Sequence, residues 1–454
     1  MLPNPSSKVL VLGTITLMVL LQMFIFISNL DYETSSREET TLSKLGQHYP
    51  FLENSTTINY ISSEIQVMFF LRGVPPGRGR SALAQAIVDT FSQNSVFCCS
   101  SQTTSVDVSD QNCLQEVEIN CKKHIRVIVV DHADNPSKDL KKYFSMAHQY
   151  NYTTVVVQPN TTVREDGGNV LQVRESNEVL QTPKMLYPLF YGWFLGYNIS
   201  LDVQRHRKTL YDECLQQSKF VEIFNKFALP GSPHNSSGGL DFGRYFSLTG
   251  LLTGPTLLHC TSFFSNYGNR TGSKQYATSS AVKQNTGGAY NLSIIGFLIT
   301  PQTFGARLRL TKDELALWGV DNSKEADKTH TESNVGSRSW VKTNKVITAR
   351  TSDTLNVDKP VSCPKGWRPQ EFSPTCGPGS RAHLTLGLGV NISAVQTGID
   401  LNLIIQQELL ARDKPKDIPT LQLAGGIARC YGEGNWAIYL EKPLKVGALF
   451  SGWN

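Results

Sequence analysis

The stretch EIQVMFFLRGVPPGRGRSALAQAIVDTF, residues 64–91, indicates how the first half of the chain folds. Residues 64–71 form an apolar run of strand length, and residues 72–80 form a turn rich in Gly, Pro and Arg. Residues 81–91 then carry apolar side chains at helical spacing. A strand, a Gly-rich turn and a helix in this order are typical of a phosphate-binding α/β domain.

The turn itself departs from a working phosphate loop. Such a loop needs backbone N–H groups around the phosphate, a Lys on the terminal phosphates and a Ser or Thr hydroxyl on Mg²⁺. Here five residues instead of four separate Gly73 from Gly79, and Arg80 stands where the Lys is expected. Two prolines remove further N–H donors, and only Ser81 fits its position. The pattern predicts a degenerate loop that binds nucleotide weakly.

The α/β pattern continues beyond this loop. A predicted strand at 125–130 ends in Asp131, where a Mg²⁺-holding Asp is expected, and a helix at 138–149 and a strand at 153–158 follow. A loop rich in Gly, Ser, Pro and Asn at 229–239 predicts a domain boundary. The expected segments are a cytosolic tip and membrane anchor at 1–30, a polar stalk at 31–63, a degenerate P-loop domain at 64–228, and a second domain at 240–454 that carries an insertion at 319–378.

Composition limits the class of protein. The chain has 454 residues, of which 40% are hydrophobic and 18% are charged, which is typical of a globular protein. The length allows two or three domains, and two is the first expectation. The net charge of +5 excludes the dense basic character of a protein that grips long nucleic acid through many phosphates. A small anionic ligand remains compatible with it.

The run from Val9 to Ser28 contains no charged residue, and a helix of this length spans ~30 Å, the thickness of a bilayer core. A cleaved signal peptide is the alternative, but it requires a shorter apolar region and a small-residue cleavage site, which is absent before Asp31. Acidic residues outnumber basic residues just after the run. This charge bias favours a cytosolic N-terminus, with the rest of the chain on the opposite side of the membrane.

Sequons agree with a lumenal body, whereas the nine cysteines leave the redox compartment open. No paired Cys-x-x-Cys set indicates zinc, so no metal site is expected. The eight Asn-x-Ser/Thr sequons begin at Asn54, Asn151, Asn160, Asn198, Asn235, Asn269, Asn291 and Asn391.

Two short motifs downstream match each other, LLHCTSF at 257–263 and RAHLTLG at 381–387. Each contains His-x-Thr in a strand-like run, and the period of two places the His and the Thr on one face. A single such motif is typical of a structural histidine, whereas two predict a site where two imidazoles and two hydroxyls converge. This group suits attack of water on a phosphodiester without a metal or other cofactor, one His acting as base and the other as acid.

With these motifs in place, the chain resembles the 2′,3′-cyclic nucleotide 3′-phosphodiesterase family of the two-histidine (2H) phosphoesterase superfamily. The resemblance extends from about residue 66 to the C-terminus. The stretches that carry it are LRGVPPGRGRSALAQAIVDTF, RVIVVDHADNPSKDLKKYFSMAHQYNYTTVVVQP, LYPLFYGWFL, LLHCTSFFSNYG, ITPQTFGARLRLTKDELALW and GSRAHLTLGLGVNISAVQTGIDL.

The resemblance implies an α/β domain similar to polynucleotide kinase and a two-lobed α+β catalytic domain. The implied reaction converts nucleoside 2′,3′-cyclic phosphates, free or at RNA ends, to 2′-phosphates. Because the two motifs are nearly symmetric, the choice between base and acid stays open. The implied roles are base for His383, acid for His259, phosphate contacts for Thr261 and Thr385, nucleotide contacts for Phe264 and Val395, and an anion-attracting position for Arg381.

Departures from the family leave further alternatives. Where kinase-like relatives place an Asp, this chain has Cys98-Cys99-Ser100-Ser101, so kinase activity is not expected. The insertion at 319–378 carries Cys363 and Cys376, and a lid, a local disulfide and a plain surface insertion are all consistent with it. The family favours a cytosolic body, against the sequons. The alternative to an enzyme is a membrane-anchored scaffold or binding ectodomain with the same fold.

Overall fold

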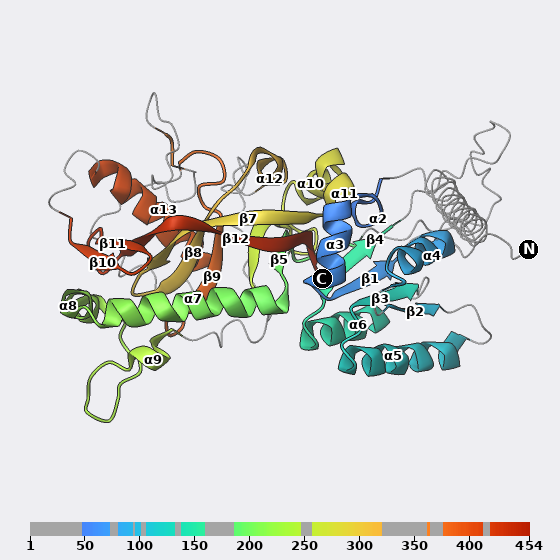
Figure 1. Ribbon diagram of the computed structural model, residues 1–454, viewed down its shortest axis with the longest axis horizontal. Helices are drawn as coiled ribbons and strands as arrows, with labels where there is room; N and C mark the ends of the chain where they lie inside the picture. The colour runs from blue at the N-terminus through green and yellow to red at the C-terminus, as the bar shows by residue number, and fades with distance from the viewer. Residues whose placement is uncertain are drawn as a thin grey trace, which may run out of the picture.

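Two β-sheets organise the molecule, one parallel and one antiparallel, and they lie side by side (Figure 1). The computed structural model describes residues 48–72, 80–93, 96–100, 106–131, 138–158, 186–246, 257–319, 361–363, 376–411 and 418–454.

The N-terminal sheet has four parallel strands in the order β2-β3-β1-β4. Every residue of β1 and β3 is buried, because helix α4 covers one face of the sheet while α5 and α6 cover the other. This unit contains α2 (Pro50–Glu53), α3 (Ser55–Ser63), β1 (Val67–Leu71), α4 (Arg80–Thr90), β2 (Val96–Ser100), α5 (Val106–Lys122), β3 (Val127–Asp131), α6 (Lys138–Gln149) and β4 (Thr153–Val157). The α/β class expected from the sequence is confirmed.

The polar stalk expected over 31–63 is wrong for its last third. Residues 50–63 form α2 and α3, and Phe51 and Ile61 are buried in the same apolar cluster as β1. The Asn54 side chain accepts a hydrogen bond from the Thr57 backbone N–H and so caps α3. The composition of this segment did not indicate helices, because most of its residues are polar. A few buried apolar side chains are enough to hold two short helices against the sheet.

The C-terminal unit is built on eight antiparallel strands. The order along the sheet is β10-β11-β12-β7-β8-β9, and β5 joins it by pairing with both β12 and β6. Its elements are β5 (Phe190–Leu195), α7 (Tyr197–Leu215), α8 (Ser218–Phe227), α9 (Phe242–Tyr245), β6 (His259–Phe264), α10 (Ser273–Thr278), α11 (Ser280–Asn285), β7 (Ala289–Ile299), β8 (Thr303–Arg309), α12 (Lys312–Ala316), β9 (His383–Leu388), α13 (Val395–Leu410), β10 (Thr420–Leu423), β11 (Gly426–Cys430) and β12 (Trp436–Trp453).

Strand β12 is long enough to pair with strands at both ends of this sheet. Its first part pairs with β11, two stretches at 436–439 and 444–449 pair with β7, and its last six residues pair with β5. The pairing with β7 shifts register between Tyr439 and Leu444, which is typical of a β-bulge. The two lobes of the expected α+β domain are therefore the two ends of one continuous sheet.

The domain boundary predicted at 228–240 is wrong. Strand β5 and helices α7 and α8 pack into the core of the C-terminal unit, so the boundary lies between Gln158 and Leu186. The Gly- and Pro-rich stretch 229–239 is a surface loop of that unit, held where the Asn235 side chain accepts from the Gly239 N–H. A loop inside a domain and a linker between domains share one composition, which explains the error.

The two units are joined through the end of β12. The Ser451 hydroxyl donates to the Thr154 carbonyl at 2.6 Å, and the Thr154 hydroxyl donates to the Gly452 carbonyl at 3.3 Å. Leu449 packs beside Val155 in the apolar cluster of the N-terminal unit. The C-terminal strand of the second unit thus lies directly against β4 of the first.

The predicted membrane anchor lies outside the described residues. Within the described ranges, which begin at residue 48, none of the helices has the length and apolar character needed to cross a bilayer.

Candidate active site

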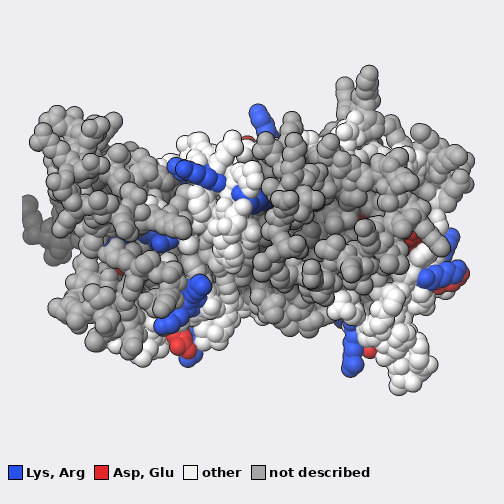
Figure 2. All heavy atoms as spheres, turned by 180° about the vertical axis from the view of Figure 1, so that it is seen from behind, with Lys and Arg blue, Asp and Glu red and all other residues white. Residues whose placement is uncertain are grey.

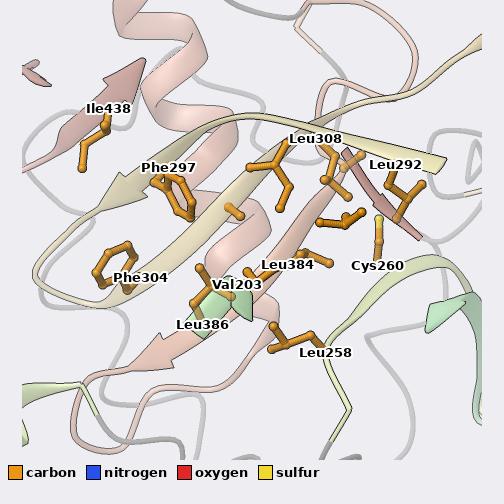
Figure 3. Close-up of a cluster of buried hydrophobic side chains, with 14 of the residues drawn as sticks. Val203, Leu258, Cys260, Leu292, Phe297, Phe304, Leu308, Leu384, Leu386 and Ile438 are labelled. Carbon is orange, nitrogen blue, oxygen red and sulfur yellow. The ribbon is translucent and has the colours of Figure 1, made fainter. Parts of the chain in front are cut away.

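The two His-x-Thr motifs occupy β6 and β9, which lie at opposite ends of the strand order. In each motif the His and the Thr are half-buried, whereas the residue between them, Cys260 or Leu384, is fully buried. Figure 3 shows both of these side chains within the apolar core. The alternation follows from the period of two along a strand, and it leaves the imidazoles and hydroxyls on the face away from the core.

The bent sheet brings the two motifs together. The backbone N–H of His383 faces the sulfur of Cys260, and the charge of a protonated His383 acts on the His259 ring. Burial raises the pKa of the Cys260 thiol to about 12, so the residue is a neutral core side chain. Two histidines separated by more than a hundred residues in the sequence therefore belong to one site.

Both imidazoles are held in the same way. Nδ1 of His259 lies 3.3 Å from the Leu257 carbonyl, and Nδ1 of His383 lies 2.6 Å from the Arg381 carbonyl. A carbonyl only accepts, so each Nδ1 carries a proton and donates it. Each Nε2 is thereby left as the atom that accepts or releases a proton.

Burial lowers the pKa of both histidines to about 4. For His259 the hydrogen bond to Leu257 acts in the opposite direction, and the charge of His383 lowers the pKa further. For His383 the hydrogen bond to the Arg381 carbonyl opposes the effect of burial, and the Arg381 guanidinium adds to it. Both rings are neutral at pH 7 in the unliganded protein.

Aromatic rings support His259 from β5 and β12. The His259 ring stacks on Phe190 and Phe194, with ring centroids 4.8 Å and 5.7 Å away. Phe190 lies 6.3 Å from the Trp453 ring, which in turn stacks at 3.4 Å on His148 of the N-terminal unit. A line of rings therefore connects the junction between the units to this histidine.

The start of α13 supports the second motif. The Thr385 hydroxyl donates to the Thr397 hydroxyl at 3.1 Å, and a Cβ added at Gly398 would come within 3.0 Å of the His383 ring. The buried Asp400 carboxylate anchors this first turn by accepting from the hydroxyls of Thr300 and Thr303, at 2.6 Å and 2.7 Å. The glycine allows the helix to approach the imidazole closely.

Four residues beside the histidines belong to none of the motifs that point to the site, namely Phe190, Phe194, Thr397 and Gly398. A glycine inside an apolar helical pattern is a signal of close packing and was available at Gly398. The two phenylalanines occur in an apolar run that gives no indication of which residue meets the imidazole.

The expected substrate contacts surround this face. Phe264 is 42% exposed and Val395 is 70% exposed, which is unusual for large apolar side chains and suits contact with a ligand. Arg381 is half-buried and immediately precedes the second motif. A further arginine, Arg270, donates to the Phe264 carbonyl at 3.4 Å. Burial lowers the Arg270 pKa and the Arg381 charge lowers it further, so two cations lie near each other here.

The degenerate phosphate loop is only partly described. Gly73 and Gly79 lie outside the described residues, whereas Arg80 begins α4 and half-buried Ser81 follows it. Arg80 donates through Nε to a carboxylate oxygen of Asp131, and the two side chains are 3% and 2% exposed. The residue in the Lys position and the residue in the Mg²⁺ position thus neutralise each other.

Cysteines form two disulfides in the described ranges, Cys99–Cys113 and Cys363–Cys376. The second bond is the local bridge considered for the insertion at 319–378. Over these same ranges no cluster of three or more His, Cys, Asp or Glu side chains is arranged to hold a metal ion.

Comparison with known proteins adds the family. The family model described as 2′,3′-cyclic nucleotide 3′-phosphodiesterase (CNP or CNPase) matches residues 187–355 and 343–454, more than half of the chain. The chain belongs to the CNPase family. The match begins at the first residues of the C-terminal unit, in agreement with the domain boundary seen in the fold.

Three curated relatives extend the likeness over most of the chain. Each carries the name 2′,3′-cyclic-nucleotide 3′-phosphodiesterase. The relative from Rattus norvegicus is 29% identical over 421 residues, the one from Mus musculus 28% over 423, and the one from Pongo abelii 27% over 433. The alignments cover 89%, 89% and 91% of this chain and 86%, 86% and 88% of the relatives.

The lowered histidine pKa values predict an acid-sensitive fold. Because each folded-state pKa is about 4 against an ordinary value of 6.5, the unfolded chain binds protons that the folded chain does not between these values. The free energy of unfolding should therefore fall as the pH is lowered from 6.5 to 4. Urea unfolding at several pH values measures this slope. Replacing His259 or His383 with Gln should flatten this slope, and a slope equal to that of the natural chain in both variants would contradict the assignment.

Proposed function

We propose that this CNPase-family chain hydrolyses 2′,3′-cyclic phosphates, on nucleotides or at RNA ends, to 2′-phosphates through His259 and His383. The observation that supports the proposal is the matched anchoring of the two rings, in which each Nδ1 donates to the carbonyl two residues earlier. Anchored alike on facing strands, the two Nε2 atoms are free for proton transfer on either side of one phosphate.

In the proposed first event, His383 acts as the base. The Arg381 guanidinium beside it opposes a positive charge on the ring, and the hydrogen bond to the Arg381 carbonyl fixes the tautomer with Nε2 unprotonated. Nε2 takes a proton from water, and the water oxygen attacks phosphorus. The new P–O bond forms as the bond from phosphorus to the 3′ oxygen breaks.

His259 is proposed as the acid that protonates the departing 3′ oxygen. Its pKa of about 4 keeps it neutral before substrate binds. The anionic phosphodiester favours the imidazolium, and the faces of Phe190 and Phe194 stabilise a cation stacked on them. His259 therefore takes up a proton from solvent when the substrate binds and transfers it to the 3′ oxygen, and the 2′-phosphate leaves with a free 3′ hydroxyl.

The remaining contacts are proposed to hold the ligand. Thr261 and Thr385 donate to phosphate oxygens, and Arg381 attracts the anion. Phe264 and Val395 cover the nucleoside with exposed apolar surface. Described lysines and arginines on the face seen in Figure 2 are scattered, several of them beside acidic residues, a distribution that suits a small ligand or a single RNA end.

The N-terminal unit is proposed to have lost phosphoryl transfer. A Mg²⁺-nucleotide needs a cation for its phosphates and a carboxylate for its metal, and here Arg80 and Asp131 are buried against each other. Separating a buried ion pair leaves an uncompensated charge, which is strongly unfavourable. The closed pair supports a structural role for this unit and at most weak nucleotide binding.

The body of the chain is proposed to lie on the lumenal or extracellular side, behind a membrane anchor at 9–28. Disulfides persist in oxidising compartments, and two occur in the described ranges. Seven of the eight sequon asparagines are described, and six of these are exposed: Asn54, Asn198, Asn235, Asn269, Asn291 and Asn391.

The catalytic pair is tested by substitution. Replacing either His259 or His383 with Ala should lower turnover of a 2′,3′-cyclic nucleotide by ~10²–10⁴-fold, the scale of one positioned proton-transfer group. The double variant should lose far less than the product of the single losses, because the two residues act as a unit. His206→Ala, at an exposed position on α7, is the matched control, and EDTA should leave turnover unchanged. Near-normal turnover in both single variants would contradict the roles proposed for the two histidines, whereas the absence of turnover in the natural chain would favour the scaffold alternative.

The closed phosphate site is tested with Mg-ATP and an RNA oligonucleotide that carries a 5′ hydroxyl. No labelled phosphate should reach the RNA, either with the natural chain or with Arg80→Lys, because Asp131 stays paired in both. Labelled product that disappears in Asp131→Asn would show that the pair opens and that the unit is a kinase.

Topology is tested on protein expressed in cells. Treatment with an N-glycosidase should increase gel mobility, and Asn235→Gln should reduce that shift by one glycan. Addition of a reductant should change mobility on a second gel by opening the disulfides. A body with unmodified asparagines that is accessible to protease from the cytosol would contradict the lumenal assignment.

A further inference from the structure

A cavity of about 350 Å³ lies where the two units meet. Its wall combines the start of α2, the ends of β1 and β4, helix α11 and the end of β12. Small-molecule sites have volumes of ~300–1,000 Å³ and occur preferentially at domain interfaces. None of the His-x-Thr residues lines it, and neither do Arg80 and Asp131, so it is separate from both sites discussed above.

The charged side chains among the described residues that line this cavity are both basic. Arg72 at the end of β1 and Lys283 on α11 line it from opposite units, and the described residues of its lining include no Asp or Glu side chain. Arg72 is half-buried, burial lowers its pKa, and the described part of the chain offers it no ion-pair partner. A desolvated guanidinium without a counter-charge is unfavourable unless an anion binds beside it.

A buried hydroxyl at the same place lacks a partner. Tyr49 is 2% exposed, lines the cavity, and its hydroxyl makes no hydrogen bond within the described ranges. Buried polar groups are nearly always satisfied, so this one indicates a missing ligand or water. The lining also includes the hydroxyls of Thr278 and Thr286, which donate to carbonyls of their own helices and keep lone pairs to accept further bonds.

We propose that this interdomain cavity binds a small molecule that carries a phosphate monoester. Arg72 and Lys283 contact the phosphate from the two units, and Tyr49 donates a hydrogen bond to the same ligand. A phosphate monoester carries a charge of ~−1.5 to −2 at pH 7, which matches two cations. Phe51 and Tyr191 supply an apolar wall for the rest of the molecule. A ligand held from both sides stabilises the docking of the units, because it binds only the folded, assembled form.

The test uses the full chain and three probes, namely inorganic phosphate, ribose 5-phosphate and adenosine 5′-monophosphate. At least one phosphate monoester should bind saturably by calorimetry and raise the midpoint of thermal unfolding. Lys283→Gln should weaken that binding by ~10–100-fold, the scale of one charge-assisted hydrogen bond, and Tyr49→Phe should weaken it by less. Lys283 is exposed, so its replacement should leave the fold and the turnover of cyclic nucleotide unchanged.

Lys442→Gln, which removes an exposed lysine of β12 outside the cavity, is the matched control and should bind like the natural chain. The three probes separate a site for phosphate alone from one that also recognises the sugar or the base. Equal affinity in Lys283→Gln and the natural chain, or the absence of saturable binding by all three probes, would overturn the proposal. Binding that is abolished only by a cyclic nucleotide competing at the His-x-Thr site would overturn it as well.

Discussion

The backbone pairing of β12 is the interaction on which most of this structure depends. One strand of 18 residues pairs with β11 and β7 along one lobe and with β5 along the other, and its last residues bond to β4 of the N-terminal unit. Because β5 in turn pairs with β6, the strand that carries His259 is placed by β12 through a single intermediate. The strand that carries His383 is reached from the other side, through β7 and β8. The site forms where these two routes meet.

The end of β12 also connects the N-terminal unit to the surroundings of His259. Trp453, near the end of β12, stacks on His148 of α6 and lies beside Phe190, whose ring supports His259. Burial lowers the pKa of His148 to about 4, so this contact is a neutral stack of rings rather than a charged one. The N-terminal unit thus provides a surface against which the last residues of β12 pack.

Sequence reasoning succeeded where the information is local. The strands and helices of the parallel unit follow from apolar runs and helical spacing, and β1, α4, β3, α6 and β4 lie within three residues of the predicted bounds. It failed where composition was the only guide. Residues 50–63 are rich in polar side chains yet fold into α2 and α3. The loop at 229–239 resembles a linker in composition yet is a surface loop within one unit. Burial of a few apolar side chains explains the helices at 50–63, and the pairing of β5 with β12 places the loop at 229–239 within the C-terminal unit. Both depend on residues far away in the sequence, so the composition of a short segment does not reveal them.

The chemistry expected of the candidate site follows from local information, because two His-x-Thr motifs supply imidazoles and hydroxyls and the period of a strand places them on one face with a buried residue between. The sequence also shows that Arg80 occupies the position where a phosphate loop carries a lysine. Other features became apparent only in the folded structure. Arg80 forms a buried ion pair with Asp131, and Phe190 and Phe194 stack on His259. Gly398 allows α13 to pack closely against His383. The same holds for the cavity between the units, whose lining comes from segments hundreds of residues apart. These contacts join residues that are far apart in the sequence, so they form only when the two sheets have folded and local sequence patterns do not reveal them.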